Sequence, residues 1–169
     1  MQDNGSTRFP VSAGVLLGLG LGGFFDGIVF HQLLQWHHML SGWYPLNSID
    51  NLKLNTTWDG IFHSAAYVLV LLGLYVLWQR ARRSDFHWSR RQCIGAVLLG
   101  WGIFNLIEGV LDHEILRLHQ VNETVPEGQR IFWDIGFLLW GAAMLVMGAA
   151  MAHSSAQGRV HAESSLHAR

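Results

Sequence analysis

The sequence predicts an all-α integral membrane protein, a four-helix bundle built from two helical hairpins repeated in parallel. Three observations support this fold class. Half of the 169 residues are hydrophobic and only 14% are charged, whereas soluble domains carry about 25% charged residues. Four apolar stretches each approach the roughly 20 residues that cross a bilayer as a helix. The first and third of them end in the same pattern of acid, glycine and histidines, offset by 82 residues.

Four helical spans are expected where these apolar stretches lie. Residues 38–57 are polar and are expected to form the loop between the first two spans. The third helix is expected to continue beyond its span to about His119. The transmembrane domain is then 10–152, between a cytoplasmic N-terminal segment, 1–9, and a disordered cytoplasmic tail, 153–169. The expected spans are residues 10–34, 58–78, 92–111 and 131–152.

Positively charged residues gather on one side of the expected spans, with eight on that side and three on the other. Cytoplasmic loops carry the excess of Lys and Arg in membrane proteins. We therefore expect a multi-pass protein of the bacterial inner (cytoplasmic) membrane, with both termini cytoplasmic. The eight are Arg8, Arg80, Arg82, Arg83, Arg90, Arg91, Arg159 and Arg169, and the three are Lys53, Arg117 and Arg130.

Acids and histidines occupy the opposite, periplasmic end of all four expected helices. The first repeat carries Asp26, His31 and His37, and each has a counterpart 82 residues later. The second and fourth spans each begin with a Trp-Asp pair. Ionisable residues in a membrane span are costly unless they are paired, so they are functional candidates by default. The counterparts are Glu108, His113 and His119, and the two pairs are Trp58-Asp59 and Trp133-Asp134.

A transition-metal site is the preferred hypothesis for this group, with zinc, copper or iron as the ion. Imidazole and carboxylate ligands suit these metals, and a bound cation offsets the penalty of burying a carboxylate. The preferred ligands are three histidines, His31, His63 and His113, with Asp59 or Glu108, and the remaining acids would orient them. The repeat axis could bring His31 and His113 to face each other. The full candidate set is His31, His63, His113, Asp59, Glu108, Asp26, Asp112 and Asp134.

Three other interpretations stay open. Two histidines related by the repeat could be axial ligands of a haem. The acids and histidines could relay protons or a cation in a transporter, or they could form a purely structural polar cluster. His37, His38 and His119 are interpreted as capping or interfacial residues near water. The sequence indicates no catalytic residue and leaves enzyme or metal-handling assembly factor undecided.

The expected partner is the lipid bilayer. A net charge of −1 without a basic tract argues against nucleic acid. The sequence leaves a homo-oligomer open.

The segments GLGGFFDGIVFHQLLQWHHMLS, WDGIFH and FNLIEGVLDHEILRLHQV resemble an uncharacterised family of bacterial predicted membrane proteins, a domain of unknown function. The resemblance covers about residues 10–150 and implies a four-helix inner-membrane protein without an assigned activity. Genes of this family are said to neighbour oxidase-assembly factors that handle copper. The resemblance therefore favours copper among the candidate metals, and respiratory oxidase assembly factors as partners.

Overall fold

All of the secondary-structure elements assigned in the described residues are helices. The structure is a computed structural model that describes residues 9–84 and 86–153. It contains four helices that are long and apolar enough to cross a membrane, which confirms the all-α membrane fold. The terminal residues 1–8 and 154–169, and the expectation of a disordered tail, lie outside the described residues. The elements are α1 (Val11–Phe25), η1 (Asp26–Leu33), α2 (Ile49–Ala81), α3 (Arg90–Glu108), η2 (Gly109–Ile115) and α4 (Glu127–His153).

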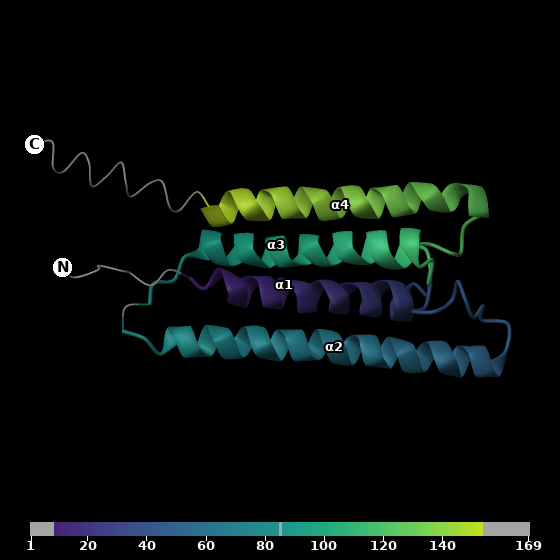
Figure 1. The fold of residues 1–169 in the computed structure, drawn as a ribbon, viewed down its shortest axis with the longest axis horizontal. Helices are drawn as coiled ribbons and strands as arrows, with labels where there is room; N and C mark the ends of the chain where they lie inside the picture. Colours follow the sequence, from purple (N-terminus) through teal and green to yellow (C-terminus); the bar gives the residue numbers. More distant parts are fainter. Residues whose placement is uncertain (1–8, 85, 154–169) are drawn as a thin grey trace, which may run out of the picture.

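The four helices lie side by side in the order α2, α1, α3, α4 (Figure 1). α1 and α3 run in the same direction through the centre, and α2 and α4 run back along the two sides. α1 packs against α2 and α3, and α3 packs against α4. The flanking helices expose large apolar side chains such as Leu72, Leu139 and Val146. Such outward-facing apolar surfaces suit contact with lipid rather than with water.

Glycines allow the two central helices to approach closely. A Cβ added at Gly18 would overlap the backbone carbonyl of Val97, and one added at Gly100 would overlap the carbonyl of Val15. These two contacts are the same contact related by the 82-residue offset. Small residues at helix interfaces let backbones meet in this way. The α1–α3 contact is therefore the axis about which the two hairpins repeat.

Both central helices change pitch before they end. η1 and η2 are π-helical continuations of α1 and α3, in which each amide bonds the carbonyl five residues back. Leu34 N donates to Val29 O at 2.8 Å, and Leu116 N donates to Leu111 O at 2.8 Å in the second half. π-Helical turns are rare and often occur at functional sites. Here they carry Asp26 and His31 in the first repeat, and Asp112 and His113 in the second.

The chain reverses immediately after each π-helical segment. Gln35 (φ 51°) and Arg117 (φ 50°) are the non-glycine residues with positive φ in the described part of the chain. This left-handed conformation costs an L-residue about 1–2 kcal/mol. The reversal folds His37 and His119 back over the helix ends instead of extending the helix. The expectation that the third helix continues to His119 is therefore wrong, because η2 ends at Ile115.

α2 begins earlier than the sequence suggests. The expected loop over residues 38–57 is wrong in its second part, because α2 starts at Ile49 and its first turns are polar. Ser48 caps it by accepting a hydrogen bond from Asn51 N at 3.1 Å. Asn55 is fully buried, accepts from Leu40 N (2.9 Å) and donates to Tyr44 O (2.9 Å). These bonds hold the preceding loop over the polar ends of the helices.

Candidate metal centre

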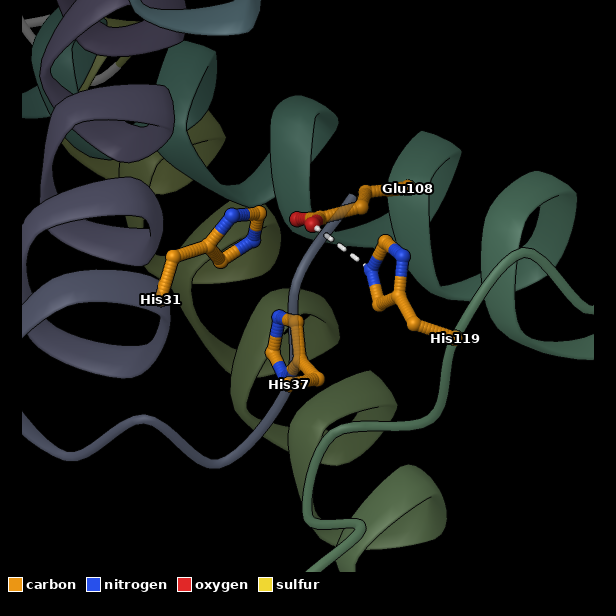
Figure 2. A group of neighbouring side chains, drawn as sticks. All are labelled: His31, His37, Glu108 and His119. Atoms are coloured by element: carbon orange, nitrogen blue, oxygen red, sulfur yellow. Dashed lines mark ion pairs between the residues drawn. The ribbon is translucent and has the colours of Figure 1, made fainter. Parts of the chain in front are cut away.

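Four side chains that could hold a metal ion converge at the end of α1 and α3 where the chain reverses. Each offers one ligand atom, and these atoms all lie within 4.8 Å of one another. Figure 2 shows their polar ends turned toward a common point. The exposed fraction of each residue is 4% or less. The four are His31 on η1, Glu108 at the end of α3, and His37 and His119 in the loops after η1 and η2.

The Nδ1 atom of each of the three histidines has an oxygen acceptor. His31 Nδ1 lies 2.9 Å from Asp59 Oδ1. His37 Nδ1 lies 2.8 Å from the backbone oxygen of Val121, and His119 Nδ1 lies 3.1 Å from that of Met39. Carbonyl oxygens and carboxylates only accept hydrogen bonds, so Nδ1 carries the proton.

The other ring nitrogen, Nε2, receives no hydrogen bond in any of these three histidines, and that of His31 lies 3.0 Å from Asp26 Oδ2 as an ion-pair contact. With the proton on Nδ1, Nε2 of a neutral imidazole presents its lone pair. Buried polar atoms in native structures normally have a partner, so unpaired ones call for an explanation. Three lone pairs aimed at one buried point could act as ligands for a cation.

The two repeats hold each other's histidines. His37 bonds to the carbonyl of Val121, and His119 bonds to the carbonyl of Met39. Met39 and Val121 are equivalent under the 82-residue offset, as are His37 and His119. The two hydrogen bonds are therefore equivalent, and each repeat binds the histidine of the other. Neither hairpin could orient its second histidine alone, so the site depends on both halves.

Asp59 and Asp134 stand at equivalent places behind the histidines. Asp59 Oδ1 accepts from the backbone N of Met39, and Asp134 Oδ1 accepts from that of Val121, both at 2.9 Å. Asp59 Oδ2 also lies 2.6 Å from His38 Nδ1. These contacts fix the loop residues that carry the histidines. The halves differ at one point, because His31 Nδ1 lies 2.9 Å from Asp59 whereas His113 Nδ1 lies 3.7 Å from Asp134.

The imidazoles pack directly on one another. The rings of His37 and His119 stack with centroids 4.3 Å apart and planes at 6°. His31 meets His37 edge to face at 4.5 Å, and His113 meets His119 edge to face at 4.8 Å. Burial and the neighbouring His37 lower the pKa of His119, which lies in the loop outside the spans. The lowered pKa favours the neutral imidazole of His119, the form that can act as a metal ligand.

Two carboxylates face this group of imidazoles. Asp26 Oδ2 lies 3.0 Å from His31 Nε2 and 3.9 Å from His37 Nε2. Glu108 Oε1 lies 3.7 Å from His119 Nε2. In the described part of the chain, the positively chargeable groups within ion-pair distance of either acid are histidines. Neither lysine nor arginine therefore pairs with these two carboxyl groups in the described residues.

The structure brings some of the residues expected from the sequence together and separates others. His31 and Glu108 lie in the converging group, with Asp26 in contact with it. His113 borders the group, and Asp59 and Asp134 lie behind the histidines. His63 and Asp112 lie outside this group. The ring of His63 packs against Gly27, and its Nδ1 bonds the backbone oxygen of Asp59 at 2.7 Å.

His37 and His119 are the residues that sequence reasoning missed. They were expected to be interfacial, but each is 1% exposed, and His38 is also buried. They belong to the converging group, and the pair that stacks face to face is His37 with His119 rather than His31 with His113. The signal was present in the sequence, because the repeat matches His37 to His119 as strictly as it matches the acids.

A polar cavity of about 460 Å³ adjoins the site on the side of the second repeat. His113 and His119 form part of its wall, so the cavity reaches the candidate ligands. Its other charged lining residues include four acids and two arginines, which makes the cavity acidic overall. They are Glu114, Glu123, Glu127, Asp134, Arg117 and Arg130.

Comparison with known proteins agrees with this fold. No curated protein and no solved structure matches the chain. Residues 13–155 match the family described as "predicted membrane protein (DUF2243)", which covers all four helices almost completely. The chain therefore belongs to the DUF2243 family of predicted membrane proteins.

Proposed function

We propose that the protein binds a transition-metal ion through Nε2 of His31, His37 and His119 and the carboxylate of Glu108. One observation carries this proposal. The Nδ1 proton of each histidine is bonded to an oxygen, which leaves three Nε2 atoms without a hydrogen-bond donor and converging in a buried space. Metal-ligating histidines commonly donate their other ring N–H to a carboxylate or carbonyl in this way. The arrangement is that of a preorganised ligand set.

A purely structural cluster accounts for less of this geometry. A protonated His31 could bridge Asp26 at 3.0 Å and Asp59 at 2.9 Å. This ion pair would still leave Nε2 of His37 and Nε2 of His119 without a hydrogen-bond donor. Unsatisfied buried polar groups each cost about 1–3 kcal/mol. A bound cation would engage all of these atoms at once.

The donor chemistry narrows the choice of ion. Three imidazole nitrogens and a carboxylate suit Zn²⁺, Fe²⁺, Mn²⁺ or Cu²⁺, whereas Cu⁺ prefers the soft sulfur of Cys or Met, which this set lacks. Haem is disfavoured because His37 and His119 stack with their centroids 4.3 Å apart, and a porphyrin between them would have to separate the rings. The proposal covers two roles for the protein, a metal-handling protein or a metalloenzyme.

We place the centre at the periplasmic side of a bacterial inner membrane. The support is the excess of arginine at the opposite end of the helices. The acidic cavity beside His113 and His119 would give cations or a small polar substrate access from that side. The nearly complete burial of the four ligands favours a resident ion over one that exchanges rapidly.

Metal analysis of the tag-free protein in detergent tests this proposal. We expect a transition metal to copurify with the wild type, or to bind stoichiometrically after incubation with Zn²⁺ and desalting. His119→Ala should lose it, because the variant removes one of three imidazoles and the reciprocal contact to Met39. Elemental analysis by mass spectrometry measures the ratio of metal to protein.

His63→Ala is the matched control for this experiment. His63 lies on α2 near the same end of the molecule but outside the converging group. It should retain the wild-type metal content. A wild type that stays metal-free after incubation with each candidate ion, while eluting as a folded species, contradicts the proposal.

A further inference from the structure

We propose that the centre is dinuclear, with one ion held by Asp26, His31 and His37 and a second held by their repeat equivalents. The equivalents are Glu108, His113 and His119. This inference rests on the proposed metal-binding function and adds Asp26 and His113 as ligands. Each repeat would supply two histidines and one carboxylate, a donor set that binds transition metals at other sites.

The first half-site has suitable distances. Asp26 Oδ2 lies 3.0 Å from His31 Nε2 and 3.9 Å from His37 Nε2. Ligand atoms about 2.0–2.2 Å from one zinc ion must lie within roughly 4.4 Å of each other, and both distances meet this limit. Apart from these ion-pair contacts, both oxygens of Asp26 are buried without a hydrogen-bond partner. The four-ligand site described above leaves this carboxylate unused.

The second half-site repeats the same elements with a looser geometry. Glu108 Oε1 lies 3.7 Å from His119 Nε2, and the ring of His113 meets that of His119 at 4.8 Å. His113 is 3% exposed, and neither of its ring nitrogens has a hydrogen-bond partner. A buried histidine without a partner on either nitrogen is costly. A second ion would use one of these nitrogens.

The two half-sites face each other at short range. The stacked rings of His37 and His119 belong to different half-sites and lie 4.3 Å apart. The four ligand atoms found within 4.8 Å of one another also come from both. Metal ions in two-metal centres lie about 3.5–4 Å apart. The half-sites are thus close enough to form a single two-metal centre.

Charge balance also favours two ions. Four buried carboxylates surround the histidines, and their exposed fractions are all 4% or less. When all four are ionised and the histidines are neutral, they carry four negative charges, which two divalent cations neutralise and one does not. Isolated buried charges are strongly disfavoured. The four are Asp26, Asp59, Glu108 and Asp134.

Metal stoichiometry after loading tests this inference. Tag-free full-length protein is stripped with a chelator, loaded with Zn²⁺ or Cu²⁺ and desalted. We expect two Zn²⁺ per wild-type chain, one per chain in His113→Ala and in Asp26→Asn, and two in the control His63→Ala. Two Cu²⁺ ions a few ångströms apart should give an exchange- or dipole-coupled EPR spectrum. His113→Ala should convert this to the spectrum of isolated Cu²⁺.

Each other outcome has a defined meaning. One ion per wild-type chain, unchanged in His113→Ala, overturns the dinuclear centre and leaves the proposed function standing. One ion that disappears in His113→Ala also overturns it, because a single ion would then share all the ligands. A folded wild type that binds none overturns both proposals. Asp26→Asn preserves side-chain shape, so it separates loss of charge from loss of fold.

Discussion

At the scale of single residues, the orientation of each imidazole is decided by the group behind it. Asp59 holds His31 at 2.9 Å and also receives the backbone N–H of Met39 at 2.9 Å. One carboxylate thus fixes both a ligand and the loop that returns to the site. Such supporting groups set the tautomer and raise the basicity of a ligating histidine.

Replacing Asp59 by asparagine should weaken metal binding without abolishing it. The amide loses the negative charge and can present its NH₂ group to His31 Nδ1, which would favour the wrong tautomer. Mutations of such partners typically reduce metal affinity by about 10–100-fold. Competition against a chromogenic chelator measures the change. Asp50→Asn, at an exposed position in the first turn of the same helix, should leave the affinity unaltered, and equal affinities for wild type and Asp59→Asn would refute the role.

At the scale of elements, the helices were predictable but their ends were not. Apolar composition is a local property, so the four spans and the acids near their ends follow from the sequence. The positions of His37 and His119 depend on reversals at Gln35 and Arg117, residues that do not mark left-handed turns as glycine does. The sequence therefore placed His37 near water, whereas the reversal buries it over the helix ends. The early start of α2 was missed because its first turns are polar and lie against loops.

The contact between α1 and α3 should be the element most sensitive to a single added methyl group. We expect Gly18→Ala to destabilise the protein by at least about 1–3 kcal/mol, the range for overpacked interiors, because the new Cβ meets the rigid carbonyl of Val97. Thermal unfolding in detergent, followed by circular dichroism, reports the loss. Gly136→Ala is the control, since a Cβ there has no neighbour within 4 Å. Equal melting temperatures for the two variants would show that α1 and α3 pack less closely at Gly18 than the structure indicates.

At the scale of the whole molecule, the repeat does more than duplicate a hairpin. The half that carries His37 orients His119, and the half that carries His119 orients His37. The polar ends of all four helices therefore form one unit at one end of the molecule, while the start of α1, the end of α4 and the loop between α2 and α3 lie at the other (Figure 1). The two ends of the molecule are therefore chemically different, and the orientation in the membrane decides which compartment the polar end meets.

The sidedness can be tested with two single-cysteine variants made in a Cys93→Ser background. Asn47→Cys places a thiol in the exposed loop at the polar end, and Ser84→Cys places one in the loop between α2 and α3. The excess of arginine around position 84 predicts that this loop is cytoplasmic. A membrane-impermeant maleimide applied to spheroplasts should therefore label Asn47→Cys at once and Ser84→Cys only after lysis. The reverse pattern would place the centre on the cytoplasmic side, so that its metal would come from the cytoplasmic pool and the acidic cavity beside His113 would open to the cytoplasm.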